Sequence, residues 1–204
     1  MKILSASTLS LFCSLQGFAN NKANLVVDPD TGITLRDGFD AELLYDIPKD
    51  QGSWVSMTFV PKGRLIVSDQ DDKGVFRVTL PTNGKPIAVE PLKGFPYEPI
   101  NWGKRKVGGA TGFLYAFDSL YMVTMTGLWR CRDTDGDDSY DKFELLKKLR
   151  MGYEHSAHSI IKTEDEKGLY LVSGNYGRIP KGVPSLQPPV WQKDSLLEAM
   201  PDQM

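Results

Sequence analysis

The fold is decided by residues 112–125, which read GFLYAFDSLYMVTM. Two apolar runs flank a short polar turn at Asp118-Ser119. Such a pattern is typical of two antiparallel strands joined by a hairpin. The second run, Tyr121–Met125, is apolar almost throughout, which predicts a strand that is buried on both faces.

The same plan occurs three times along the chain. Residues 56–69 and 158–174 also consist of an apolar strand, a polar turn and a second apolar strand. The second strands match through Val67, Val123 and Val172, and all three are nearly continuous apolar runs, as expected when both faces of a strand are buried. These valines define a repeat of roughly 50 residues, and a period of this size is the signature of a repeat architecture.

The first two repeats share a third strand that begins after a glycine. Residues 75–78 follow Gly74, and residues 128–131 follow Gly127. Four-stranded blades of roughly 40–50 residues around an axis fit this period. The sequence therefore predicts an all-β protein, a partial N-terminal β-propeller of about three blades. A β-sandwich is the alternative, although it gives no reason for the same glycine-and-strand signature to occur twice.

The N-terminus carries the three parts of a secretory signal peptide. Lys2 precedes the short apolar run 3–15, and Gly17-Phe18-Ala19 supplies the small residues of a cleavage site. We expect residues 1–19 to be removed and residues 20–204 to form the incomplete propeller domain. The mature chain is then exported, periplasmic or extracellular, without a membrane span, because the run is too short for a permanent membrane helix. A buried N-terminal helix is the alternative.

Composition excludes several classes of function. The net charge of −2 gives no sign of nucleic-acid binding. Cleavage leaves Cys131 as the remaining cysteine, which excludes an internal disulfide, a covalent haem and a cysteine zinc site in this stretch. Closed propellers need about four to eight blades, so we expect the chain to be part of a longer protein.

An acidic segment, residues 133–144, is the strongest chemical signal. Compared with the twelve-residue calcium loop, carboxylates stand at positions 1, 3, 5, 9 and 12. These are Asp133, Asp135, Asp137, Asp141 and Glu144. Position 6, where that loop needs glycine, is Asp138, and Asp tolerates a left-handed backbone. The sequence predicts a calcium loop entered from a strand, with an exit that is either helix or strand. An acidic hairpin without metal is the alternative.

Both histidines lie in the segment 153–158, which reads YEHSAH. It immediately precedes the first strand of the third repeat. Two histidines beside Glu154 suit a catalytic base with its orienting group, or metal ligands. A structural role in a loop is the alternative for this pair.

Taken in order, these motifs resemble a known family. They comprise residues 67–70 and 76–78, residues 127–130, the acidic loop, residues 154–158 and residues 170–175. The set is similar to the glucose/sorbosone-dehydrogenase-like propeller at the start of large exported bacterial proteins labelled membrane-bound dehydrogenases. The resemblance covers the chain from about Gly38 and implies a ring of six blades.

The resemblance also implies a chemistry. Quinoprotein glucose dehydrogenases bind pyrroloquinoline quinone and calcium, and a histidine before a strand takes the proton of the substrate. The matching residue here is His155, and Asn175 and Arg178 match a segment near the cofactor. We treat the acidic loop as a separate structural calcium site.

Two functions follow as expectations. The first is part of a sugar or alcohol oxidoreductase, which passes electrons to the quinone and then to a c-type cytochrome module of the full-length protein. The chain by itself is then expected to be inactive, since the remaining quinone contacts come from later blades. The second is a non-catalytic, calcium-stabilised propeller that binds glycans or partner proteins, because a propeller fold by itself does not fix a function.

Overall fold

The structure is a computed structural model that describes residues 25–29, 32–36, 38–96, 100–102, 105–149 and 157–174. The predicted signal peptide lies outside the described residues. Two compact units divide the chain, Met1–Leu44 and Tyr45–Met204. The described part of the first unit contains a short hairpin of β1 (Leu25–Val27) and β2 (Thr34–Arg36).

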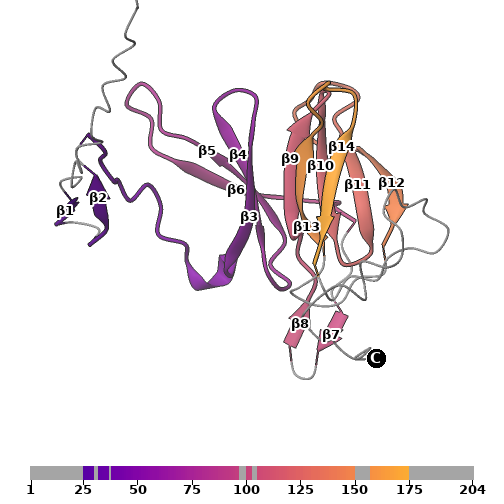
Figure 1. The fold of residues 1–204 in the computed structure, drawn as a ribbon, viewed down its shortest axis with the longest axis horizontal. Coiled ribbons are helices and arrows are strands. Elements are labelled where there is room, and N and C mark those ends of the chain that lie inside the picture. The colour runs from indigo at the N-terminus through magenta and orange to yellow at the C-terminus, as the bar shows by residue number, and fades with distance from the viewer. Residues whose placement is uncertain are drawn as a thin grey trace, which may run out of the picture. The chain divides into compact units, whose positions relative to one another are not determined.

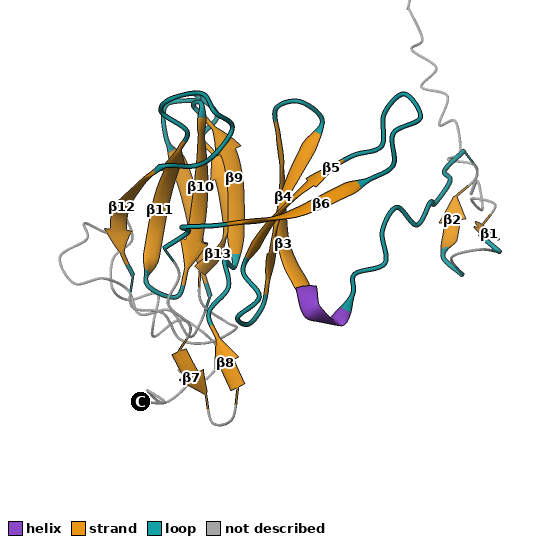
Figure 2. Cartoon of the chain, turned by 180° about the vertical axis from the view of Figure 1, so that it is seen from behind, coloured by secondary structure: helices purple, strands orange, loops and turns teal. Residues whose placement is uncertain are grey.

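The chain is all-β, as predicted. In the part that the structure describes, every element is a strand except one 3-10 turn, Lys49–Gln51 (Figure 2). The described sheets are antiparallel and none of them closes on itself. The same residues include no helix with the length and apolar character needed to cross a membrane.

The first sheet is a four-stranded meander in the order β3-β4-β5-β6 (Figure 1). Its strands are β3 (Trp54–Val60), β4 (Arg64–Asp69), β5 (Val75–Thr79) and β6 (Ala88–Leu92). The first three coincide with the strands predicted from the repeat. The fourth, β6, contains Pro91, and it lies at the edge of the sheet, where a residue without an N–H is tolerated.

The second sheet repeats this meander. Its strands are β9 (Gly112–Ala116), β10 (Ser119–Thr124), β11 (Gly127–Arg132) and β12 (Lys142–Lys148). Consecutive strands pair in the order β9-β10-β11-β12. The sequence allows either a helix or a strand after the acidic segment, and the structure contains the strand β12 there.

The third repeat is described as a hairpin of β13 (Ala157–Lys162) and β14 (Leu169–Ser173). A smaller hairpin, β7 (Ile100–Trp102) and β8 (Arg105–Val107), lies between the first two sheets in the sequence. The first strands of successive repeats are neighbours, because β9 contacts both β3 and β13.

Strand β10 is buried along its whole length, as predicted for a strand with both faces covered. Its side chains alternate between two cores. Leu120 and Met122 belong to the core shared with the first sheet, whereas Tyr121 and Val123 belong to the core shared with the third hairpin. The alternation follows from the two-residue period of a strand.

The core between the first two sheets contains buried residues from both. They are Val60, Ile66, Val75, Ala110, Phe113, Leu120, Met122 and Cys131. Burial raises the pKa of the Cys131 thiol to about 12, so this free cysteine is held as an unreactive thiol.

The prediction of burial on both faces is wrong for β14. Tyr170 and Val172 are 58% and 56% exposed, and Ile161, opposite Tyr170 on β13, is 58% exposed. The other face of the hairpin packs on the second sheet through Ile160 and Leu171. β14 is half exposed because no described element covers its outer face.

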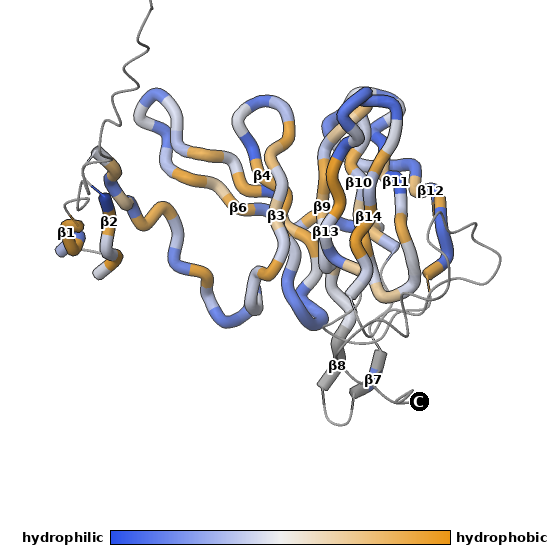
Figure 3. The backbone as a smooth tube through the Cα atoms, viewed as in Figure 1, coloured by the Kyte–Doolittle hydropathy of each residue, from blue (hydrophilic) through white to orange (hydrophobic). Residues whose placement is uncertain are grey.

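The first sheet also has an apolar outer face. Val55, Met57 and Phe59 alternate along β3 and are each at least half exposed. They follow the same two-residue period as the buried strands. Apolar residues therefore lie on the outward faces of the first sheet and of the third hairpin as well as between the sheets. Figure 3 shows how hydrophobic and hydrophilic residues are distributed along these strands.

The turn between β9 and β10 differs by one residue from the prediction. It consists of Phe117 and Asp118, with φ angles of 50° and 48°, and Ser119 already belongs to β10. Two positive φ values match the primed turns that suit the right-handed twist of a two-residue hairpin. Phenylalanine is unusual in that conformation, so the sequence favours the later pair Asp118-Ser119 for the turn.

Asp69 closes the corner at the end of β4. Its side chain is 1% exposed, and its carboxylate accepts N–H bonds from Ser53 (2.7 Å), Asp71 (2.9 Å) and Lys73 (3.0 Å). Three donors satisfy a buried carboxylate that would otherwise be costly. Asp69 therefore joins the segment before β3 to the loop between β4 and β5.

Two glycines allow the sheets to approach each other. A Cβ atom on Gly109 would lie 1.7 Å from the carbonyl oxygen of Asp69, and one on Gly112 would lie 1.8 Å from the carbonyl oxygen of His158. In both places the obstacle is backbone, which cannot rotate away. Close contact between successive repeats thus requires glycine at these positions.

We expect Gly112→Ala to lower the free energy of unfolding by about 3 kcal/mol, because the new methyl group forces β9 away from β13. Gly84→Ala is the matched control. Gly84 has a φ of 76° and open space around it, so its substitution costs only about 1 kcal/mol of backbone strain. Chemical denaturation of both variants measures the difference, and equal losses would show that the contact at Gly112 is unimportant.

Asp69→Ala should cost about 3 kcal/mol, because it leaves three N–H groups without their acceptor in a buried corner. Asp72→Ala, an exposed acidic residue in the same loop, should change the free energy of unfolding by less than about 0.5 kcal/mol. Thermal or urea unfolding gives both values. The assigned role of Asp69 is wrong if the two variants are equally stable.

Candidate calcium loop and its junction with the first sheet

The acidic loop connects β11 to β12 and gathers three of the five predicted ligands. Asp133, Asp135 and Asp137 each offer a carboxylate oxygen, and these oxygens all lie within 4.8 Å of one another. All three residues are exposed. The spacing of alternate residues in a tight loop therefore produces the cluster that the sequence predicted.

Hydrogen bonds from the loop backbone hold these carboxylates. Asp133 accepts the N–H of Gly136 (2.7 Å) and that of Asp138 (2.9 Å). Asp137 accepts the N–H of Ser139 (2.7 Å). Gly136 and Asp138 have φ angles of 78° and 77°. The left-handed conformation considered for Asp138 at position 6 is thus the one that the structure contains.

The other two predicted ligands do not join this group and bind other partners. Asp141 accepts the N–H (3.0 Å) and the hydroxyl (2.6 Å) of Thr134, and the hydroxyl bond lowers the pKa of Asp141. Glu144 lies 3.1 Å from Arg132 and 3.7 Å from Lys142. Because Glu144 is opposite Arg130 in the ladder, the strand exit carries it along β12 and away from the loop.

The three clustered carboxylates suit a hard cation. Calcium takes six to eight oxygen ligands, and an ion held here would complete its shell with water or backbone carbonyl oxygens. The described cluster contains no nitrogen or sulfur donor, which makes it unsuitable for zinc or copper. The donor set therefore fits calcium better than a transition metal.

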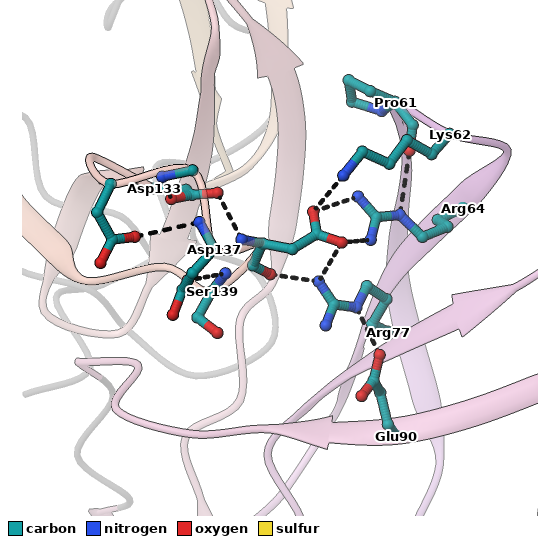
Figure 4. Close-up of polar contacts among 11 residues, drawn as sticks. Pro61, Lys62, Arg64, Arg77, Glu90, Asp133, Asp137 and Ser139 are labelled. Carbon is teal, nitrogen blue, oxygen red and sulfur yellow. Dashed lines mark hydrogen bonds and ion pairs between the residues drawn. The ribbon is translucent and has the colours of Figure 1, made fainter.

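The carboxylate of Asp138 contacts the first sheet and is not part of this cluster. Figure 4 shows the surroundings of this contact, with Lys62, Arg64 and Arg77 on one side and Asp133 and Asp137 on the other. Its carboxylate is paired with both terminal nitrogens of Arg64, one of them at 2.8 Å, and with Lys62 at 3.2 Å. The backbone carbonyl oxygen of Asp138 accepts a hydrogen bond of 2.5 Å from Arg77. Glu90 in turn accepts a bond of 2.7 Å from Arg77. These contacts form the junction between the acidic loop and the first sheet.

Electrostatics at the junction are dominated by the pair of Arg64 and Asp138. The hydrogen bond from Arg64, assisted by Lys62, holds the pKa of Asp138 well below its usual range. The same bond raises the pKa of Arg64. The side chains of Arg64 and Arg77 are only 12% exposed, so both guanidinium groups need the acceptors that they have.

Aromatic packing supports the loop beside this junction. Tyr140 packs against the core between the two sheets. Its ring lies edge to face with that of Phe95, with 5.5 Å between the ring centroids. Phe143 contacts Phe95 in the same way, with 5.3 Å between the ring centroids. Burial raises the pKa of Tyr140. The loop is therefore anchored by ion pairs at Asp138 and by apolar contacts two residues later.

The predicted catalytic and cofactor residues, His155, Asn175 and Arg178, lie outside the described residues. The described position nearest to His155 is Ala157, which is buried and starts β13. Its carbonyl oxygen accepts the hydroxyl of Thr111 at 2.9 Å. The segment with the histidines therefore leads into a strand that is fixed against the second sheet.

Sequence reasoning missed the roles of Arg64 and Arg77. Both are charged residues within strands that are otherwise rich in apolar residues, 64–69 and 75–79. A charge in such a strand requires a partner, which was a usable signal. The identity of the partner was not readable, because Asp138 is 74 positions from Arg64 in the chain.

Comparison with known proteins identifies no relative of this chain. The chain matches no family model, and neither a curated protein nor a solved structure is significantly similar to it. The resemblance to glucose/sorbosone-dehydrogenase-like propellers therefore rests on the ordered sequence motifs alone and stays a prediction.

Proposed function

We propose that this chain is an exported β-propeller module in which a calcium-binding loop stabilises the contact between successive blades, and that it binds glycans or partner proteins. The observation that carries the proposal is the cluster of Asp133, Asp135 and Asp137 in a loop that is also bonded to the neighbouring sheet. A calcium ion in this loop would have a structural task, since it would order residues that connect two sheets.

The arrangement of the sheets supports the propeller part of the proposal. Propellers consist of four-stranded antiparallel blades around a central channel. Both complete sheets are four-stranded meanders, and the first strands of successive repeats are neighbours. The exposed apolar residues on β3, Val55, Met57 and Phe59, suit contact with a further sheet or a partner protein.

Repulsion among carboxylates supports the calcium part. Three negative charges within 4.8 Å destabilise one another unless a cation or ordered donors compensate them. The loop N–H groups compensate part of this charge. A bound divalent ion would neutralise the remainder and would stabilise the folded chain by an amount that grows with the logarithm of the free ion concentration divided by Kd.

Calorimetric titration of the chelator-treated chain with calcium tests this site. We expect Asp133→Asn and Asp137→Asn to weaken binding at least about tenfold, because each removes one charged ligand and affinity follows the ligand charge. Asp72→Asn, which removes an equal charge from an exposed loop residue outside the cluster, should bind like the unmodified chain. Absence of calcium binding, or equal weakening in all three variants, would exclude the site.

A second candidate function is part of a sugar or alcohol oxidoreductase that uses pyrroloquinoline quinone and passes electrons to a c-type cytochrome. The observation that favours it is the anchoring of Ala157 to Thr111, since a residue two positions earlier, His155, is the one that matches the catalytic base. In this function His155 would accept the hydroxyl proton of the substrate, and the quinone, when bound, would supply the oxidant that takes the hydride from the same carbon. Asn175 and Arg178 would contact the cofactor.

For this second function, dye-linked dehydrogenase activity of the full-length protein with added quinone and calcium is the measurement. Loss of a general base should reduce the activity of His155→Ala by about 10²–10⁴-fold. Lys162→Gln, at an exposed position of the strand that follows, β13, is the control and should retain most of the activity. Unchanged activity in His155→Ala would falsify the catalytic assignment.

A further inference from the structure

Asp138 makes hydrogen bonds both within the acidic loop and with the first sheet. Within the acidic loop, its N–H donates to the Asp133 carboxylate at 2.9 Å. Across the junction, its carboxylate pairs with Arg64 and its carbonyl oxygen accepts a bond from Arg77. A single residue therefore links the acidic loop to both β4 and β5.

The identity of residue 138 is informative because two requirements oppose each other. With a φ of 77°, the backbone there favours glycine, which has no side chain to clash. Glycine, however, would leave Arg64 without its bidentate acceptor. Aspartate satisfies both requirements, since it tolerates the left-handed region and supplies the carboxylate.

The charges around Asp138 come from every element that faces it. Lys62 lies in the turn before β4, Arg64 is in β4, Arg77 is in β5 and Glu90 is in β6. The arginine side chains are largely withdrawn from water. If Asp138 left this position, two guanidinium groups would lose acceptors in a place where water replaces them poorly.

We propose that the acidic loop is a conformational latch, in which Asp138 couples the hydrogen-bonded shape of the loop to the docking of the second sheet on the first. Opening the loop at Asp133 loosens the strands that carry Arg64 and Arg77. By the reciprocity of coupled equilibria, removal of Arg64 loosens the loop to a similar degree. The latch goes beyond the proposed calcium site and does not require an ion, because all of its bonds are made by protein groups.

Hydrogen exchange of the full chain, measured by mass spectrometry with a chelator present, tests the latch. Asp133→Ala removes the two carboxylate oxygens that accept the N–H groups of Gly136 and Asp138, and the substituted residue lies outside the first sheet. We expect this variant to speed hydrogen exchange in residues 64–69 and 75–79. The expected acceleration is roughly fivefold or more, as for the loss of one hydrogen bond. Arg64→Met should in turn speed exchange at Gly136, Asp138 and Ser139.

Asp135→Ala is the matched control. It removes the same charge from the same cluster, and the bond that Asp135 accepts, from the N–H of Asp137 at 3.2 Å, does not involve Asp138. Its effect should stay within the loop. If Arg64→Met does not fold, Arg64→Lys supplies the same measurement, because it keeps the charge and removes the bidentate pair.

Two results would overturn the latch. One is an Asp133→Ala variant in which exchange changes only within residues 133–141. The other is an Asp135→Ala variant that loosens the first sheet as much as Asp133→Ala does, since this would indicate a general effect of loop charge. Because calcium is chelated throughout, failure of the latch and failure of the calcium site are separate outcomes.

Discussion

The burial of β10 on both faces is the constraint on which the rest of the described structure depends. Leu120 and Met122 fill one core, and Tyr121 and Val123 fill the other. Fully burying a large apolar side chain contributes roughly 1.5–3 kcal/mol, whereas a typical hydrogen bond contributes about 1 kcal/mol net. The stacking of sheets on both sides of β10 is therefore fixed mainly by apolar burial.

Polar contacts then determine where the stacked sheets meet. A flat apolar face tolerates sliding, because hydrophobic contact has no direction. Asp69 ties the corner of the first sheet through three N–H bonds, and Gly109 and Gly112 admit the neighbouring backbone. Arg64 and Asp138 add a bond of fixed geometry at the other end of the sheets. Alignment of the sheets thus rests on a few buried groups.

The parts of the fold that were predictable are those with a continuous apolar pattern. β4 and β10 were readable because burial on both faces demands consecutive apolar residues, which are present at 65–67 and 120–123. β6 was not, because it is an edge strand with Glu90 and Pro91 in its middle. The pattern of β14 matched that of a buried strand. Whether another element covers its outer face depends on tertiary structure, which the sequence of the strand alone does not determine.

The same distinction applies to the candidate site. Alternate aspartates in a tight turn converge by local geometry, so Asp133, Asp135 and Asp137 were predictable from spacing. Glu144 was assigned by analogy with a loop that continues into a helix, and that spacing does not transfer to a strand exit. His155 lies outside the described residues, so its assignment remains a prediction.

Asp138 shows how a departure from a local pattern can identify a tertiary contact. Considered within its loop, aspartate at a left-handed position is a poorer choice than glycine, and it weakens the match to a calcium loop. Considered with Arg64, it is the residue that supplies the acceptor for a largely buried guanidinium group. Conflict between local preference and residue identity is expected where a second requirement acts. At this position the second requirement is the attachment of one sheet to the next, which also explains why the misfit is found in the loop that reaches across the junction.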